Sequence, residues 1–367
     1  MGNPEILIGE NDLTSLSYLH EPAVLHNLRI RFVDRNEMYT YCGIVLVAIN
    51  PYREMDCYNN HTIMAYRGHT MGDLDPHLYA VSEEAFKLME RNHTNQSIIV
   101  SGESGAGKTV SAKYTMKYFA TVGGMGDEET QVERRVLASS PIMEAMGNAK
   151  TTRNDNSSRF GKYIQIDFNQ NYKITGARMR TYLLEKCRVV FQAPEERNYH
   201  IFYQICAARE RPELKGIHLK DCSEFLYTNQ GNSPTIGHVD DEAEFVKTQE
   251  AFLLLGFSVA DMRSLYKILA ALLYLGNVTI LGRAGTSGNE TSYVQGDDTN
   301  LELVAELLEV EEKPLRTWLC NRKIVARNES YTKPMNPVEA NTAQDALVKS
   351  HLQPNSTPFI SQGKKGK

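Results

Sequence analysis

Residues 102–109 of the chain read Gly-Glu-Ser-Gly-Ala-Gly-Lys-Thr, which fills every position of the phosphate-binding pattern G-x-x-x-x-G-K-[ST]. In this pattern successive backbone N–H groups surround a di- or triphosphate, while the lysine adds a cation and the threonine a ligand for Mg²⁺. Glycine permits backbone conformations and a close approach to the ligand that a side chain would block. The predicted phosphate loop consists of Gly102, Glu103, Ser104, Gly105, Ala106, Gly107, Lys108 and Thr109.

The residues on either side of the phosphate loop predict a strand before it and a helix after it. The run 97–100 (Ser-Ile-Ile-Val) is short, apolar and suited to a buried strand. Residues 110–122 place apolar side chains on one helical face, and Gly123-Gly124 would end that helix. A helix that begins at the loop adds a favourable field for anions. We therefore expect an α/β fold of the P-loop NTPase type, mostly a β-sheet core flanked by helices.

Composition narrows the functional class without identifying it. The 367 residues are 41% hydrophobic and 23% charged, which is typical of a soluble globular protein. A formal net charge of −5 gives no reason to expect nucleic acid as a partner. Six cysteines without a C-x-x-C pair indicate neither a zinc site nor a disulfide framework, and a reducing cytosol is the simplest location. The most apolar run, 268–275, is too short for membrane insertion.

Hydrophobic patterning predicts the remaining organisation. Residues 39–50 are predicted as one strand, and 162–181 as a β-meander with a polar turn. Helices are expected to dominate 195–275, with one apolar stripe formed by Leu265, Ile268, Leu269, Leu272 and Leu273. Residues 282–300 are rich in Gly, Ser, Thr and Asp and predict an exposed loop, and 351–367 predict a disordered tail.

A second polar segment, 154–162 (Asn-Asp-Asn-Ser-Ser-Arg-Phe-Gly-Lys), has the residue types that a nucleotide switch needs. Two adjacent hydroxyls, flanking amides and an arginine can complete a Mg²⁺ shell, hold a water molecule and sense a γ-phosphate. Taken alone, the segment is explained somewhat better as an ordinary polar turn.

Together, segments 102–109 and 154–162 closely resemble the P-loop and switch I of myosin motor domains. The resemblance continues through Asn50-Pro51-Tyr52 and through 196–202 (Glu-Arg-Asn-Tyr-His-Ile-Phe), and it covers the chain from about residue 3 to 349. The stretches 109–114 and 119–124 are most similar to class V unconventional myosins. The resemblance implies a partial motor domain over residues 1–350. Its nucleotide-binding part would end near residue 150, with switch I, the meander and the upper, actin-side helical part following to 350.

The resemblance also implies roles for individual residues. Lys108 would contact the β- and γ-phosphates of ATP, and Thr109 and Ser158 would ligate Mg²⁺. Ser157 would hold the attacking water, and Asn154 would lie near the bridging phosphate oxygens, with Arg159 as the switch I arginine. The adenine ring would lie near the turn formed by Asn50, Pro51, Tyr52 and Tyr58.

Residues 321–335 resemble the loop through which the upper part of a myosin head touches actin. The resemblance gives F-actin as partner and the actin cytoskeleton as location, and the charges would suit an acidic filament. The basic residues concerned are Arg322, Lys323, Arg327 and Lys333. A solvated hairpin explains the same residues nearly as well.

The family's third phosphate-sensing element, switch II, reads Asp-Ile-x-Gly-Phe-Glu, and no Asp-x-x-Gly occurs in this chain. The resemblance breaks after Lys349, so we expect a truncated head in which Arg159 lacks its switch II glutamate. Loss of that closure removes water positioning, so weak or no ATP turnover, no force and marginal stability are expected. No IQ motif is present, and light chains or calmodulin are not expected as partners.

Three functional classes remain open at this stage. The first is a truncated myosin head that binds ATP and Mg²⁺; the sequence leaves open whether it is an active ATPase. The second is a non-enzymatic fragment that binds nucleotide or actin, or an abortive splice or gene product. The third, an unrelated P-loop kinase or GTPase, is disfavoured because no Asn-Lys-x-Asp guanine-binding motif occurs.

Overall fold

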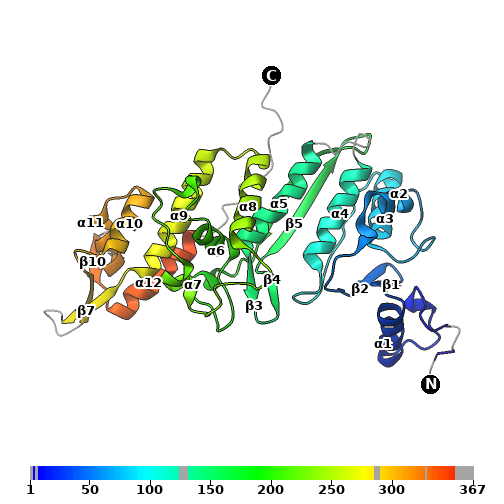
Figure 1. Cartoon of the computed structure of the whole chain (residues 1–367), viewed down its shortest axis with the longest axis horizontal. Coiled ribbons are helices and arrows are strands. Elements are labelled where there is room, and N and C mark those ends of the chain that lie inside the picture. The colour runs from blue at the N-terminus through cyan, green and yellow to red at the C-terminus, as the bar shows by residue number, and fades with distance from the viewer. Residues whose placement is uncertain (1–2, 5–6, 124–130, 285–289, 327–328, 352–367) are drawn as a thin grey trace. The chain divides into compact units, whose positions relative to one another are not determined.

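The computed structural model describes residues 3–4, 7–123, 131–284, 290–326 and 329–351 (Figure 1). The chain divides into two compact units, and each is described by itself. Unit 1 contains the described residues up to Ser140 together with Ile164–Arg178. Unit 2 contains Pro141–Tyr163 and the described residues from Met179 onward. The predicted tail after residue 351 lies outside the described residues.

Unit 1 is built from a β-hairpin and a group of helices. Its main elements are α1 (Glu21–Arg29), β1 (Tyr39–Cys42), β2 (Val45–Ala48), α2 (Asn60–Tyr66), α3 (Leu78–Asn92) and α4 (Lys108–Val122). Short 3-10 turns lie at Leu13–Ser15 and Asp56–Tyr58, and a π-helical turn at Ile30–Asp34 continues α1. Helix α4 packs beside α3 (Figure 1). Their contact surface belongs to an aromatic core formed by Tyr39, Tyr58, Ile63, Leu78, Tyr79, Phe86, Tyr118 and Val122.

Three elements, α5 (Gln131–Gly147), β5 (Gly161–Phe168) and β6 (Ile174–Tyr182), contribute residues to both units. Helix α5 passes from unit 1 into unit 2 at Pro141, a residue that cannot donate a helical hydrogen bond. Strands β5 and β6 pair with each other. The part of this pair in unit 1 packs on α4, because Ile164 and Ile166 contact the buried Met116 and Ala177.

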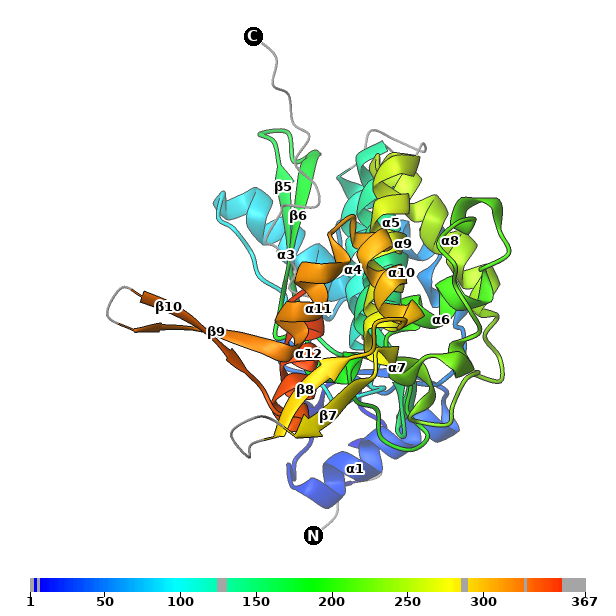
Figure 2. The ribbon, with the colours of Figure 1, turned by 90° about the vertical axis from the view of Figure 1, so that its left-hand side faces the viewer.

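Unit 2 consists mainly of helices around α9 (Val259–Asn277), whose second half is almost completely buried. The other helices are α6 (His200–Ala207), α7 (Leu226–Asn229), α8 (Asp241–Leu255), α10 (Thr299–Leu308), α11 (Glu312–Cys320) and α12 (Pro337–His351). The described residues of this unit also form three hairpins: β3 (Asn148–Thr151) with β4 (Asn154–Ser158), β7 (Ile280–Ala284) with β8 (Glu290–Val294), and β9 (Asn321–Ala326) with β10 (Glu329–Pro334). Figure 2 shows β9–β10 projecting away from α10, α11 and α12.

The fold class is confirmed as α/β, with a phosphate loop that leads into a helix. Helix α4 begins at Lys108 and ends at the predicted stop, Gly123. The β5–β6 pair, the helices after residue 195 and the buried positions Leu269, Leu272 and Leu273 are confirmed as well. Among the described residues the strands pair only in twos, as five separate two-stranded sheets.

Three local predictions were wrong. Residues 39–50 form a hairpin rather than one strand, because Gly43 adopts a φ of +59° and reverses the chain. Residues 97–100 form no strand, and the Ile99 side chain is 90% exposed. Residues 282–300 contain the β7–β8 pair and the start of α10 rather than a loop. Each error concerns strand pairing, which depends on partners that a local pattern does not reveal.

A buried histidine lies in the aromatic core of unit 1. The His77 ring contacts Tyr39, Tyr58, Tyr66 and Tyr79, and its Nδ1 accepts the N–H of Tyr79 at the start of α3. Burial lowers the pKa of His77 from 6.5 to about 4. The imidazole is therefore neutral in the folded protein at pH values where the unfolded chain already carries a proton.

His77 is expected to make unit 1 acid-sensitive. Between pH 6.5 and about 4 only the unfolded state binds the proton, so stability falls as pH falls through this window. From pH 7 to pH 5 the expected loss is about 2 kcal/mol. His77→Asn keeps a cap acceptor for α3 but cannot titrate. Urea unfolding followed by circular dichroism should show a smaller loss in His77→Asn; equal losses in both proteins would contradict this assignment.

Unit 2 contains a buried ion pair. The Arg197 side chain is fully buried and donates from Nη2 to Oδ2 of Asp241, in the first turn of α8, at 2.7 Å. Its guanidinium lies 3.7 Å from the ring centroid of Tyr203. Burial raises the pKa of Asp241 above its usual range, although Arg197 acts in the opposite direction. Within the described residues Nε and Nη1 of Arg197 have no hydrogen-bond partner.

Candidate phosphate site and switch segment

The phosphate loop in unit 1 has the backbone conformation that its glycines predict. Gly105 and Gly107 have φ values of +81° and +92°, which side chains rarely adopt. A Cβ on Gly102 would lie only 3.1 Å from that of Ala106, so the loop is too tight for a larger residue. Gly107 is the N-cap of α4 and supplies no side-chain cap. The first N–H groups of α4 therefore provide an anion-binding helix terminus.

Lys108 closes the phosphate loop on itself. Its ammonium donates to the carbonyl oxygens of Gly102 at 2.6 Å and of Glu103 at 2.7 Å. A phosphate bound in the loop would offer the ammonium charged oxygens in place of these neutral acceptors, and charge-assisted hydrogen bonds are the stronger ones. The Lys108 ammonium therefore lies within the phosphate loop, in contact with its backbone.

Asn50 contacts the phosphate loop directly. Its Nδ2 donates to the carbonyl oxygen of Gly105 at 2.6 Å, and its Oδ1 accepts the N–H of Tyr52 at 3.0 Å. The amide thus connects the turn after β2 to the middle of the loop, 55 residues away. The sequence placed Asn50 near the nucleotide through a family resemblance, but no local pattern revealed this contact with the loop.

Asn50→Ala is expected to weaken nucleotide binding by about fivefold, because an ordinary hydrogen bond contributes about 1 kcal/mol. Asn50→Asp is the informative control. It keeps the acceptor for Tyr52 but places a carboxylate against the Gly105 carbonyl, so it should bind nucleotide no better than alanine. Titration with a fluorescent ATP analogue measures the affinity of each variant. Normal affinity in Asn50→Asp would show that the contact with Gly105 does not contribute to nucleotide binding.

The other residues predicted near the base differ in exposure. Tyr52 is 79% exposed and lies in the turn after Pro51. Tyr58 is buried instead: its ring stacks on Tyr114 at 3.7 Å between centroids and its hydroxyl lies 2.6 Å from that of Tyr39. Of these two side chains, Tyr52 is the one accessible from solvent.

In unit 2 the segment 154–162 begins in the β3–β4 hairpin. Strand pairing sets Ser157 opposite Ala149 and Ser158 opposite Asn148. Ser157 is buried and its Oγ accepts a hydrogen bond from Nη1 of Arg159 at 3.1 Å, whereas Ser158 is exposed. The Oδ1 of Asn154 accepts the N–H of Asn156 within β4, and the Asn154 N–H donates to the Oγ1 of Thr151 across the turn between β3 and β4. The structure thus brings Ser157 and Arg159 together.

Arg159 has a carboxylate partner that sequence reasoning missed. Its Nε donates to Oε2 of Glu185 at 2.7 Å. The sequence led us to expect Arg159 without its family partner, and no spacing rule connects two residues that are 26 positions apart. Burial raises the pKa of Glu185, but hydrogen bonds from Arg159 and Arg188 outweigh this effect and leave the pKa below its usual value.

The donor set of the phosphate loop in unit 1 suits the oxygens of a polyphosphate. It consists of the glycine-rich backbone, the first turn of α4 and the Lys108 ammonium. In unit 1, Thr109 lies at the second position of α4 and carries a hydroxyl oxygen, which can be a ligand of Mg²⁺ beside phosphate. In unit 2, Ser158 lies at the end of β4 and also carries a hydroxyl group. Among the described residues, no cluster of three or more His, Cys, Asp or Glu side chains offers another metal site.

The β9–β10 hairpin carries the basic residues predicted for the actin contact. Arg322 lies directly opposite Lys333, and Lys323 lies opposite Thr332. The described side chains of both strands from Arg322 to Pro334 are exposed. Arg327 lies outside the described residues. The hairpin form agrees with the solvated alternative, and it also displays two cations side by side, an arrangement that favours an anionic surface.

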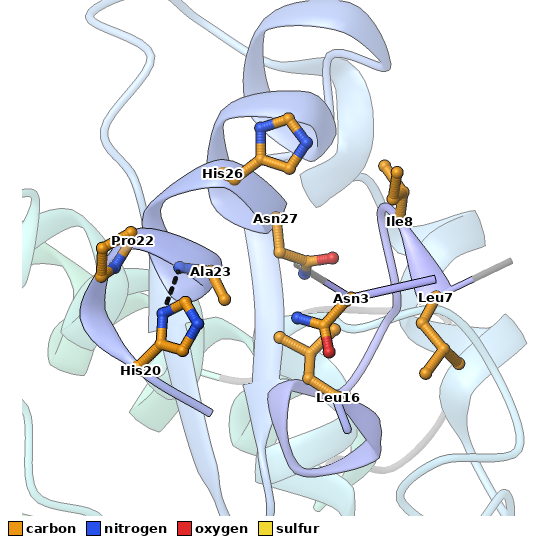
Figure 3. A pocket seen from close by; sticks show the side chains of 9 residues that line it. All are labelled: Asn3, Leu7, Ile8, Leu16, His20, Pro22, Ala23, His26 and Asn27. Atoms are coloured by element: carbon orange, nitrogen blue, oxygen red, sulfur yellow. Dashed lines mark hydrogen bonds between the residues drawn. The ribbon is translucent and has the colours of Figure 1, made fainter. Parts of the chain in front are cut away.

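A separate pocket of about 380 Å³ lies between the N-terminal segment and α1 in unit 1. Figure 3 shows Leu7, Leu16 and Ala23 around it, with Nδ1 of His20 accepting the N–H of Ala23 at the start of α1. Its lining is mostly apolar and contains no residue of the phosphate loop. It is therefore not the predicted nucleotide site.

Comparison with known proteins gives a consistent result. The family model described as "Myosin head (motor domain)" matches residues 10–354. Unconventional myosin-Vb of Homo sapiens is 58% identical over 95% of this chain and 19% of its own length. Unconventional myosin-Va of Gallus gallus is 56% identical over 98% of this chain and 19% of its own length. Myosin-2 of Saccharomyces uvarum is 47% identical over 95% of this chain and 22% of its own length. The chain thus spans about a fifth of the length of these curated relatives.

Proposed function

Because the chain belongs to the myosin head family, we propose that its phosphate loop binds MgATP and that its β9–β10 hairpin contacts actin filaments. The proposal for ATP is supported chiefly by the loop 102–109, whose glycine conformations, helix terminus and lysine form one polyphosphate cradle. The same family membership makes the cytoplasmic actin cytoskeleton the proposed location. None of the helices in the described residues is long and apolar enough to cross a membrane.

We propose for single residues the roles that membership of the myosin head family implies. Lys108 would hold the β- and γ-phosphates, and the hydroxyls of Thr109 and Ser158 would ligate Mg²⁺. Ser157 would orient the attacking water, with Asn154 near the phosphate oxygens. Tyr52, the exposed aromatic side chain in the turn after β2, would lie against the adenine, and Pro51 would shape that turn.

We further propose that these 367 residues bind MgATP more readily than they hydrolyse it and generate no force alone. The sequence contains no Asp-x-x-Gly element to sense the γ-phosphate, and the charge of Arg159 is already matched by Glu185. Hydrolysis by this class of site depends on positioning the water and neutralising the transferring phosphoryl group. These 367 residues have the phosphate loop 102–109 but lack the element that would align water with the γ-phosphate. They would therefore bind nucleotide without hydrolysing it efficiently.

The direct test uses the purified 367-residue chain with a fluorescent ATP analogue and a phosphate-release assay. We expect saturable binding that requires Mg²⁺ and that ATP displaces better than GTP. Phosphate release should be slow and should not accelerate when actin filaments are added. Absence of saturable binding would overturn the ATP proposal, and release that actin accelerates would overturn the proposal of poor hydrolysis.

The actin contact predicts a charge effect at the hairpin. The double variant Lys323→Glu/Lys333→Glu should co-sediment with actin filaments about tenfold more weakly at low salt, because it reverses two charges facing an acidic partner. The difference should shrink as salt rises. The variant Lys215→Glu/Lys313→Glu carries the same charge change at other exposed positions and serves as control. Equal weakening in both would indicate that net charge, rather than the hairpin, controls binding.

A further inference from the structure

The contact between Arg159 and Glu185 is formed by both side chain and backbone. The Arg159 Nε donates to Glu185 Oε2 at 2.7 Å, and the Glu185 N–H donates to the Arg159 carbonyl oxygen at 3.0 Å. Both side chains are about 70% buried, with exposed fractions of 27% and 30%. Partial burial reduces solvent screening, so this pair is stronger than an ion pair on an open surface.

Glu185 is itself held in place by a second arginine. The same Oε2 accepts a hydrogen bond from Nε of Arg188 at 2.7 Å, and Arg188 is almost completely buried. Nη1 of Arg188 donates in turn to Oε2 of Glu196 at 2.9 Å. In addition, the hydroxyl of Tyr199 donates to the Glu185 carbonyl oxygen at 2.7 Å. The Glu185 carboxylate is therefore a fixed charge and not a mobile surface group.

The guanidinium of Arg159 also contacts Ser157, another residue of the switch segment 154–162. Nη1 donates to the Oγ of Ser157 at 3.1 Å, and the Arg159 N–H donates to the carbonyl oxygen of Gly147 at 2.9 Å. A serine hydroxyl rotates freely unless a neighbour fixes its lone pairs. Because Arg159 donates to the Ser157 Oγ, it occupies one of the lone pairs of that oxygen and helps to fix the direction of the hydroxyl group.

We propose that Glu185 is a positioning residue for the switch segment: its carboxylate aligns the Arg159 guanidinium, and through it the Ser157 hydroxyl. A long arginine side chain holds one direction only when two of its nitrogens are engaged, and Glu185 and Ser157 provide these two contacts. The use of this contact in handling the γ-phosphate rests on the proposed function.

Hydrogen exchange measured by mass spectrometry tests the proposal without requiring turnover. In Glu185→Gln, amides of the peptide 154–163 should exchange about tenfold faster, the size expected for loss of one charge-assisted hydrogen bond. The α9 peptide 259–277 should keep its protection. Glu185→Asp retains the charge on a shorter side chain and should restore part of the protection that glutamine loses.

The matched control is Glu196→Gln. It removes the other carboxylate on Arg188 but touches neither Arg159 nor Ser157, so the peptide 154–163 should exchange as in the unmodified chain. Arg159→Gln removes the opposite end of the same contact and should reproduce the effect of Glu185→Gln. The double variant Glu185→Gln/Arg159→Gln should exchange no faster in the peptide 154–163 than either single variant. Normal exchange in Glu185→Gln and Arg159→Gln, or equal acceleration in Glu196→Gln, would overturn the proposal.

Addition of MgATP separates this proposal from the proposed function. We expect nucleotide to protect the phosphate-loop peptide 97–109 in both the unmodified chain and Glu185→Gln, but to protect 154–163 only in the unmodified chain. If nucleotide protects neither peptide in any variant, the ATP proposal fails, while the nucleotide-free exchange still decides the role of Glu185. If Glu185→Gln gains full protection of 154–163, Glu185 is not a positioning residue.

Discussion

Lys108→Ala is expected to weaken MgATP binding by about 10- to 150-fold. This range corresponds to the loss of one or more charge-assisted hydrogen bonds to phosphate, worth about 1.5–3 kcal/mol. The ammonium already lies within the loop, 2.6 Å and 2.7 Å from two of its carbonyl oxygens, so no rearrangement of the helix is needed to reach a phosphate. Titration with a fluorescent ATP analogue measures the change.

Lys113→Ala provides the matched control for this experiment. Lys113 lies on the same helix, is exposed and carries the same charge, but it lies outside the phosphate loop. Its replacement should leave affinity within about twofold, because an exposed charge in water interacts only weakly with a ligand that it does not contact. Comparable losses in both variants would show that the helix responds to charge in general, and unchanged affinity in Lys108→Ala would remove the loop from the binding site.

Arg197→Met is expected to destabilise unit 2 by about 3–5 kcal/mol, the range found when one partner of a buried ion pair is removed. The larger part of this loss comes from the Asp241 carboxylate, which is only 12% exposed and would remain without its cation. The contact with the Tyr203 ring is lost as well. Urea unfolding can be followed through Trp318 in α11, the single tryptophan of the chain and a reporter of unit 2.

Two controls identify the buried charge as the cause. In Arg197→Met/Asp241→Asn the uncompensated carboxylate is gone, so the double variant should be more stable than Arg197→Met alone. The single variant should also lose less stability at pH 5 than at pH 8. Without Arg197 the pKa of Asp241 rises further above its unfolded value, so protonation at lower pH relieves the penalty. A double variant less stable than the single one would show that packing around Arg197 dominates.

The sequence predicted those parts of the site whose geometry is local. A phosphate loop and the helix after it are determined by glycines, a lysine and a 3.6-residue period within about 20 residues, and α4 begins and ends close to the predicted positions. The contacts of Asn50 with Gly105 and of Glu185 with Arg159 cross 55 and 26 residues, and no periodicity records them. They depend on where the elements pack, which a local pattern does not determine.

The strand predictions also succeeded where the pattern is local and failed where pairing depends on distant residues. The β5–β6 pair was recognised because alternation and a polar turn occur within one stretch. Residues 282–300 have the composition of a loop, yet the N–H of Ser292 in β8 donates to the Met335 carbonyl oxygen, and Ser292 and Val294 are buried. Residues 97–100 have the composition of a strand, yet no strand pairs with them among the described residues. In both cases the pairing partner, rather than the segment, decides the outcome.

The exposed β9–β10 hairpin has a consequence for handling the protein. Both strands have an outer edge with backbone groups available for pairing, and Val325 and Tyr331 are 68% and 53% exposed. Such an edge is a template for strand addition between molecules, and nearby lysines and arginines prevent this by repulsion. Arg322, Lys323 and Lys333 would thus act as a safeguard against aggregation. Neutral substitutions on this hairpin would promote self-association, whereas charge reversals would preserve solubility.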